Sequence, residues 1–280
     1  GVANFDAMMA LPELPEVENS SVPQKTDVVF QNVSFSYDGS EHKALDGVSF
    51  TAPEGQITAV VGPSGGGKST IAHLIPRFWD VQSGSISIGN TDIRNLSEET
   101  LMGQVSFVFQ DVYLFGQSIL ENIRMGRPDA TDDEVIRAAK AAMCHEFIAR
   151  LPKGYDTVFG EEGVHLSGGE AQRISIARAI LQDAPILVLD EATAFADPEN
   201  EQQIQAALKE LMKGKTVLMI AHRLGTVRTA DQILVMENGR LAEYGAHQTL
   251  LERNGTYTRM WERYTQSLTW GIGRKEETHA

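Results

Sequence analysis

The chain has 280 residues, 42% of them hydrophobic, and a formal net charge of −14 at pH 7. It can bury a sizeable core in one large domain, or in one domain with a subdomain, and it is neither a disordered nor a repeat sequence. The acidic balance argues against a nucleic-acid partner, which needs a clustered basic face, and no apolar run approaches the roughly 18 residues that span a bilayer. The single cysteine, Cys144, rules out an internal disulfide and suits a reducing cytosol.

The two ends of the chain are expected to lie outside the folded domain, which we place at residues 28–268. Residues 1–27 are rich in proline and polar residues and are predicted to be an extended linker, while residues 269–280 are expected to be a disordered tail. The partly alternating run at 28–35 predicts a strand. It leads to Tyr37, which either stacks on a base or lies in a surface turn.

A glycine-rich loop stands between a strand-like run at 57–61 and a helix-like run at 71–75. It fits the pattern G-x-x-x-x-G-K-[ST] in the strand-loop-helix setting where that pattern binds phosphate. Backbone N–H groups converge on an oxyanion at the positive end of the helix, the lysine can reach the β- and γ-phosphates, and the serine can ligate Mg²⁺. A chance glycine turn rarely places these groups in register, so the segment predicts a nucleotide site formed by Gly62, Ser64, Gly65, Gly66, Gly67, Lys68, Ser69 and Thr70.

Two further strands are expected at 83–88 and 105–109, the second ending at Gln110. From Thr131 the sequence becomes helical, because Thr131 and Glu134 form a capping box ahead of strong helix formers. We place this helical insertion in a subdomain that covers about residues 111–182.

A second anion site is predicted at the start of the helix that follows Leu166. Ser167 and Glu170 form another capping box, which is the purely structural explanation of the motif. A cap does not require two consecutive glycines, however, and the bare N–H groups of Gly168 and Gly169 can bind an anion. Two phosphate-binding helix ends in one chain suggest that a nucleotide is shared between two copies.

Acidic residues and a histidine follow two more predicted strands. The buried-strand run at 186–190 ends in Asp190 and Glu191, and the run at 216–220 precedes His222. Ligands of open α/β sheets bind at such carboxyl ends of strands. Asp190 would orient the Mg²⁺ shell and Glu191 would polarise the attacking water. His222 could contact the γ-phosphate, although a lone histidine is more often structural.

The last part of the domain is predicted to contain a hairpin and a helix. Asn238 and Gly239 join two apolar runs and favour a type I′ turn. A helix is expected near residues 257–266.

Taken in order, these motifs resemble the nucleotide-binding domain of ATP-binding cassette (ABC) transporters over nearly all of residues 28–266. The resemblance implies an α/β P-loop NTPase fold with a RecA-like core sheet, an antiparallel β subdomain and an α-helical signature subdomain. It also implies ATP and Mg²⁺ as cofactors. The matching set is Tyr37, the Walker A loop at 62–69, Gln110, the LSGGE signature at 166–170, the Walker B end at Asp190 and Glu191, and His222.

The resemblance also implies a role for each of these residues. Tyr37 would stack on adenine, and Gln110 would sense Mg²⁺ and water, joining Ser69 and Asp190 as metal ligands. Ser167 and Gly169 would contact the γ-phosphate held by the opposite subunit, so the implied partner is a second nucleotide-binding domain in a homo- or heterodimer. The expected catalytic residues are Glu191, His222, Gln110 and Lys68, and the expected nucleotide contacts further include Gly168, Glu170 and Asp197.

Two loops resemble those of exporter-type transporters, namely the Gln loop at 109–115 with its continuation at 118–123, and the X-loop at 157–163. Such domains normally follow a six-helix membrane domain in the same chain. Residues 1–27 would then be the linker from that domain, or an added leader, and the domain would lie at the cytoplasmic face of the cell (inner) membrane. A loop is normally at the surface, so Tyr113, Leu114 and Phe115 are expected to form an exposed patch that receives a helix of the membrane domain.

One short segment departs from the exporter pattern. Residues 195–197 are Phe-Ala-Asp, where exporters commonly have Ala-Leu-Asp. The Phe-Ala-Asp form is similar to that of exporter-fold transporters that handle iron siderophores, which is an analogy at the level of the family.

Two alternative functions fit the same motifs. A soluble ABC ATPase usually carries a coiled-coil insertion, a second cassette or basic surfaces, and this sequence has none of these. A regulatory cassette that does not hydrolyse ATP would be expected to have lost at least one of Lys68, Asp190, Glu191 and His222, all of which are present.

Overall fold

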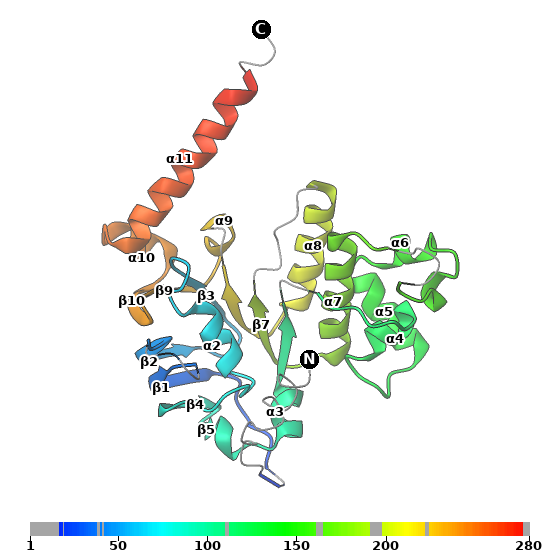
Figure 1. Ribbon diagram of the computed structural model, residues 1–280, viewed down its shortest axis with the longest axis horizontal. Helices are drawn as coiled ribbons and strands as arrows, with labels where there is room; N and C mark the ends of the chain where they lie inside the picture. Colours follow the sequence, from blue (N-terminus) through cyan, green and yellow to red (C-terminus); the bar gives the residue numbers. More distant parts are fainter. Residues whose placement is uncertain are drawn as a thin grey trace.

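The computed structural model describes residues 17–18, 20–37, 40, 42–109, 112–160, 165–190, 198–221 and 224–276, without the side chains of 198–199 and 267–276. Its architecture is mixed α/β and contains two sheets (Figure 1). In Figure 1 the helical subdomain lies on one side of the central sheet and the antiparallel sheet on the other.

The central sheet has six strands in the order β10-β9-β3-β8-β7-β6. Five of them run parallel, and β10 pairs antiparallel with β9. Strands β3 and β7 are almost continuously buried, as expected for parallel strands that have both faces covered. The strands are β3 (Ile57–Val61), β6 (Val105–Val108), β7 (Ile186–Asp190), β8 (Thr216–Ile220), β9 (Gln232–Glu237) and β10 (Arg240–Gly245).

The predicted hairpin is confirmed between β9 and β10. Asn238 and Gly239 have φ angles of 50° and 75°, the two positive values that a type I′ turn requires. Asparagine and glycine adopt this conformation at low cost, so the turn sequence fixes the register of this sheet edge.

The second sheet is antiparallel, with the order β2-β1-β4-β5. Phe30 and Phe50 face each other across β1 and β2, and their rings stack with centroids 4.5 Å apart. One hydrophobic cluster joins this sheet to the central sheet through α2 (Lys68–Leu74), which contributes Ile71 and Leu74. The strands are β1 (Val28–Phe35), β2 (Leu45–Ala52), β4 (Ser83–Ile88) and β5 (Thr91–Asp92), followed by η1 (Ile93–Asn95) and α3 (Glu98–Gln104).

The helical subdomain forms a second hydrophobic cluster. Both predicted capping boxes are confirmed: Thr131 with Glu134 begins α5, and Ser167 with Glu170 begins α7. The helices that build this cluster or adjoin it are α4 (Ile119–Arg124), α5 (Asp132–Ala141), α6 (His145–Ala149), η2 (Gly154–Asp156), α7 (Gly168–Gln182) and α8 (Pro198–Leu211).

The C-terminal helices pack against one face of the central sheet, over β3 and β9, around the buried Tyr257. They are α9 (Leu224–Val227), α10 (His247–Glu252) and α11 (Thr256–Glu276). Figure 1 shows that the end of α11 projects away from the body of the molecule. The prediction of a disordered tail was wrong for residues 269–276, because these residues continue α11. Once packing has fixed the first turns of a helix, each further residue forms one more backbone hydrogen bond without paying the entropic cost of starting the helix.

The described part of the predicted linker, residues 17–18 and 20–27, contains no helix or strand. It is nevertheless attached to the domain. Ser20 Oγ accepts a hydrogen bond from Ser97 N at 2.8 Å, and the Thr26 and Thr216 hydroxyls lie 2.8 Å apart. Within the described ranges, no helix combines the length and the apolar character that a membrane-spanning segment needs.

Candidate functional site

Three neighbouring parallel strands bring Asp190 and the glycine-rich loop to the same end of the central sheet. Asp190 at the end of β7 pairs in register with Ile220 of β8, and Ile220 pairs in turn with Val60 of β3. Gly62 begins the glycine-rich loop two residues after Val60. The glycine-rich phosphate loop (residues 62–69) and Asp190 therefore lie together at the carboxyl ends of the strands, which is where open α/β sheets bind ligands.

Four predicted site residues lie outside the described part of the chain: Gln110, Glu191, Asp197 and His222. Gln110 and His222 come two residues after β6 and β8, and Glu191 directly follows β7. Their assignment rests on the sequence.

The glycine-rich loop follows a path that only glycine permits. Gly62, Gly65 and Gly67 have φ angles of 146°, 75° and 95°, in the region that side chains other than glycine rarely adopt. A β-carbon on Gly62 would lie 2.1 Å from the carbonyl oxygen of Met236, and one on Gly67 would lie 2.6 Å from that of Ala44. The loop is thus confined by neighbouring backbone at Gly62 and Gly67, where glycine is required by space as well as by φ, whereas at Gly65 only the φ angle favours glycine.

The side chain of Lys68 turns back over this loop. The residue is 5% exposed, and its ammonium donates hydrogen bonds to the carbonyl oxygens of Gly62 and Pro63, both at 2.9 Å. A buried cation beside the N–H groups at the start of α2 favours a bound anion, because a second charge of opposite sign compensates the loss of hydration. Ser64 and Gly65 are exposed at the loop surface, so this donor set is accessible to a polyphosphate.

The oxygen ligands at this edge fit Mg²⁺ together with a nucleotide. Among the described residues, no three histidine, cysteine or acidic side chains gather around one point. The half-buried Ser69 hydroxyl and the Asp190 carboxylate are hard oxygen donors. Mg²⁺ usually takes one or two such protein ligands and completes its shell with phosphate oxygens and water.

Tyr37 lies next to the phosphate loop. Its hydroxyl is 3.1 Å from Oγ1 of the buried Thr70. Its ring meets the rings of Phe35 and Trp79 at near-right angles, with centroids 4.9 Å and 5.3 Å away. The aromatic residue that the sequence proposes for base stacking is therefore held against the helix that carries Lys68.

The second predicted anion site is the start of α7. Ser167 N donates to Glu170 Oε2 at 2.8 Å, and Glu170 N donates to Ser167 Oγ at 3.2 Å. Ser167 and Gly168 are exposed, whereas Gly169 is buried. Figure 1 shows α2 and α7 on opposite sides of β7, so the two helices belong to different parts of the domain.

Sequence reasoning missed two buried polar residues that connect α7 to its surroundings. Gln172 Nε2 donates to the carbonyl of Phe109 at 3.2 Å, and Arg173 Nη1 donates to Asn200 Oδ1 at 2.6 Å. The first bond joins the signature helix to the end of β6, and the second joins it to α8. Their sequence signal was weak, because α7 also carries Ser175 and Arg178 among its apolar residues, and their exposures of 0% and 3% are seen only in the structure.

The predicted exposed patch is only partly correct. Tyr113 and Phe115 are 70% and 39% exposed, but Leu114 is 7% exposed and belongs to the hydrophobic cluster of the helical subdomain. Successive side chains in an extended loop point to opposite sides, so the middle residue faces inward.

Two polar side chains fix the backbone of this loop. The buried Asn122 accepts from Phe115 N at 2.9 Å and donates to Phe115 O at 3.0 Å. Arg178 donates to Tyr113 O at 2.8 Å and to Asn122 Oδ1 at 2.7 Å. Burial lowers the pKa of the Arg178 guanidinium. These hydrogen bonds therefore hold in place the backbone that carries the exposed side chains of Tyr113 and Phe115.

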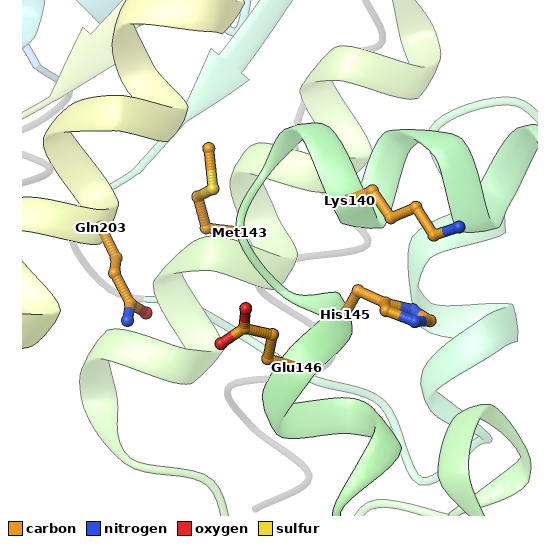
Figure 2. Close-up of a pocket in the computed structure, with 5 residues that line it drawn as sticks. All are labelled: Lys140, Met143, His145, Glu146 and Gln203. Carbon is orange, nitrogen blue, oxygen red and sulfur yellow. The ribbon is translucent and has the colours of Figure 1, made fainter.

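A separate pocket lies in the helical subdomain (Figure 2), with a cavity volume of about 280 Å³. Its described lining contains none of the predicted site residues. Figure 2 shows the carboxylate of Glu146 facing Gln203 of α8 across the opening. The described lining residues are Lys140, Met143, His145, Glu146 and Gln203.

Comparison with known proteins decides the family. A sequence profile described as "ABC transporter" matches residues 45–194, more than half of the chain. The chain belongs to the ABC transporter family. It is an ABC nucleotide-binding domain of the exporter type.

Relatives of this ABC domain include larger proteins of differing names. An ATP-dependent lipid A-core flippase of Desulfotalea psychrophila is 47% identical over 263 residues, which are 92% of this chain and 46% of that protein. The mycobactin import ATP-binding/permease protein IrtA of Mycolicibacterium smegmatis is 51% identical over 235 residues, which are 84% of this chain and 27% of that protein. This ABC domain thus spans about half the length of the curated relatives it matches, or less.

The fold also matches a solved structure of the family. A bacterial Atm1-family ABC exporter with ATP bound aligns with a TM-score of 0.85 and 44% sequence identity. The alignment covers 94% of this ABC domain and 46% of that chain. The α/β architecture with a helical subdomain is therefore that of the ABC ATPases.

Proposed function

We propose that this domain binds and hydrolyses ATP as the motor of an exporter-type ABC transporter. The observation that carries the proposal is the phosphate loop, where a glycine-only path brings the buried Lys68 ammonium and the start of α2 together. This arrangement supplies concentrated positive charge to a polyphosphate. An uncharged ligand would gain little free energy of binding from this positive charge.

The residues of the chain divide the chemistry as follows. Lys68 and the N–H groups of the loop hold the β- and γ-phosphates, while Ser69, Asp190 and Gln110 supply oxygen ligands for Mg²⁺. When bound, Mg²⁺ neutralises charge on the phosphate oxygens. Glu191 orients and polarises the attacking water, and His222 contacts the γ-phosphate. Phosphoryl transfer requires mainly positioning and charge compensation, which this set provides.

Two copies would complete each site. The starts of α2 and α7 are both suited to anions, and they belong to different parts of one domain. We therefore propose that Ser167 and Gly169 of one domain close on the nucleotide held by a second nucleotide-binding domain, identical or homologous. Head-to-tail pairing of this kind places two ATP molecules between the two domains.

The domain would act on a membrane part of the same transporter. The relatives named as a flippase and a permease are longer than this chain, which supports a location at the cytoplasmic face of the cell (inner) membrane. Tyr113 and Phe115 form the surface that we propose receives a helix of that part. A soluble ABC ATPase that is not attached to a membrane domain is the alternative, and a full-length protein that works in the cell without any membrane partner would favour it.

For the cargo, we propose iron-siderophore complexes as the class to test first. The Phe-Ala-Asp form of residues 195–197 and the similarity to the mycobactin importer support this choice. Stimulation of ATP hydrolysis in the full-length protein by a ferric siderophore, and not by lipid A, is the expected result. The opposite order of stimulation would exclude this cargo class.

Steady-state hydrolysis and nucleotide binding test the motor function itself. Glu191→Gln should bind ATP as the wild type does and lose nearly all hydrolysis, because the amide retains the shape but not the charge that polarises water. Lys68→Ala should instead weaken nucleotide binding. Wild-type turnover by Glu191→Gln, or unchanged nucleotide affinity in Lys68→Ala, would contradict these roles.

A further inference from the structure

The turn that follows α2 has an unusual conformation. Arg77 is not a glycine, yet its φ angle is 61°, which residues with a side chain rarely adopt. Its guanidinium binds Asp80 through two hydrogen bonds, from Nε to Oδ1 at 2.7 Å and from Nη2 to Oδ2 at 3.0 Å. The Arg77 side chain is 9% exposed, so this bidentate ion pair is largely shielded from water. The pair closes the turn that contains Phe78 and Trp79.

The two aromatic rings of this turn contact each other, with centroids 6.3 Å apart, and both lie 6.2 Å from the ring of His73, but their other neighbours differ. Phe78 is 47% exposed and lies 6.0 Å from the ring of Phe107 in the central sheet. Trp79 is 39% exposed and reaches the antiparallel sheet, where its ring centroid is 5.3 Å from that of Tyr37 at an interplanar angle of 89°. The turn thus connects the end of α2 to Tyr37, the residue that the sequence proposes for stacking on the base of the bound ATP.

The contacts of Tyr37 restrict its ring plane. Phe35 meets it at 85° and Trp79 at 89°, and the three rings form a closed triangle because Phe35 and Trp79 are 6.2 Å apart. Among the described residues, Tyr37 has no partner stacked in parallel with it. Edge-to-face contacts hold an aromatic ring in place, and neither Phe35 nor Trp79 is itself stacked in parallel on Tyr37.

The same helix connects this ring to the phosphate loop. α2 begins at Lys68 and carries Thr70, whose hydroxyl is 3.1 Å from the Tyr37 hydroxyl. Trp79 lies in the turn after the end of α2, and its ring also contacts Tyr37. Tyr37 is therefore in contact with the first turn of α2, which carries the phosphate-binding Lys68, and with the turn that follows α2.

We propose that Trp79, held by the Arg77–Asp80 turn, is a positioning residue that sets the plane of Tyr37 at the correct distance from the phosphate loop for an adenine base. This inference rests on the proposed function, because it requires Tyr37 to be the base platform. It assigns Trp79 no contact with the phosphates. Loss of Trp79 should therefore affect binding of the base and leave binding of the phosphates unchanged.

The test compares ATP with inorganic tripolyphosphate, which has the phosphates but no base. Dissociation constants of both are measured by calorimetry for the wild type, Tyr37→Ala, Trp79→Ala, Trp79→Phe and Phe78→Ala. Trp79→Ala should weaken ATP about threefold to tenfold, the range for loss of an aromatic pair, and leave tripolyphosphate unchanged. Trp79→Phe should recover most of the ATP affinity. Phe78→Ala removes a ring that contacts Trp79, with centroids 6.3 Å apart, but not Tyr37, so it should weaken ATP less than Trp79→Ala does and leave tripolyphosphate unchanged.

The outcomes separate this inference from the proposed function. If Tyr37→Ala weakens ATP and Trp79→Ala does not, Trp79 is not a positioning residue and the base platform stands. If Trp79→Ala weakens ATP and tripolyphosphate equally, its role is in the fold of α2, and the inference is wrong. If Tyr37→Ala changes neither ligand, the assignment of Tyr37 to the base fails and the inference fails with it.

Discussion

A β-carbon on Gly169 would lie 2.9 Å from Cγ and 3.0 Å from Cβ of Asn200. Gly169 belongs to the signature motif at the start of α7, and Asn200 lies in the first turns of α8. The glycine therefore has a role within its own chain, in addition to the contact with a second chain that its motif suggests. It permits the close approach of these two helices.

We expect Gly169→Ala to destabilise the domain by roughly 1–3 kcal/mol, the usual cost of an extra carbon in a packed contact. Asn200→Ala in the same chain should recover part of that loss, because it removes Cγ and Oδ1, two of the three atoms that the new methyl group meets. Thermal unfolding of the two single variants and the double variant measures the coupling. Strictly additive effects would show that the two residues do not oppose each other in this way.

Sharing of the active site between two chains can be tested with variants that each damage one half of it. Lys68→Ala disables the phosphate loop. Gly168→Asp places a carboxylate at the start of α7, where an acidic residue is compatible with the helix dipole, so the fold should be retained. Each variant alone should be inactive, and mixing the two should recover part of the ATP hydrolysis, because one intact site is formed in each mixed dimer.

The control for this mixing experiment is each variant alone at doubled concentration, which should remain inactive. Mixed dimers detected by crosslinking, but without recovered activity, would contradict a site that functions with one intact half from each chain. Full activity of Gly168→Asp alone would show that the start of α7 does not bind the nucleotide.

Tyr113 and Leu114 are neighbours in sequence, but their substitution should have different consequences. In a full-length transporter, Tyr113→Asp should reduce transport more than basal ATP hydrolysis and leave the melting temperature unchanged, because its side chain is 70% exposed. Leu114→Ala should lower the unfolding free energy by about 2–5 kcal/mol, as expected for a truncated core leucine. Equal loss of transport and hydrolysis in Tyr113→Asp, with a lower melting temperature, would mean that Tyr113 also serves the core.

The stability of the domain should decrease in alkaline solution through Cys144. Burial raises the pKa of this thiol to about 12, whereas in an unfolded chain a thiol ionises near pH 8.5. The thiol is protonated in both states below pH 8.5, so its contribution is fully present there. It is lost as the pH rises towards 12, because only the unfolded chain releases the proton.

Urea unfolding as a function of pH measures this effect. The free energy of unfolding should fall by up to about 1.4 kcal/mol per pH unit for this proton, and Cys144→Ala should show a shallower decline. The range between about pH 9 and 10 is the most informative, since the partly buried Tyr155 and the buried Tyr257, whose pKa values burial raises to about 12, contribute mainly above it. Identical slopes for wild type and Cys144→Ala in this range would contradict the assignment.

The sequence by itself determined the elements whose causes are local. Both capping boxes, the turn at Asn238 and Gly239, the strand-loop-helix around Lys68 and the strand ending at Asp190 all occur as predicted. In each case the deciding interaction joins residues within a few positions of each other, so the pattern in the chain contains the physical cause. The order of the motifs likewise sufficed to indicate the family.

Only the tertiary structure decided how distant residues meet. The inward turn of Leu114, the support of its loop by Asn122 and the contact of Trp79 with Tyr37 depend on side chains brought together by packing. The extension of α11 to Glu276 follows from the same cause, because the first turns of that helix are fixed against other elements. Such contacts leave no local pattern, since their free energy comes from burial between segments whose separation in the chain carries no information about their distance in space.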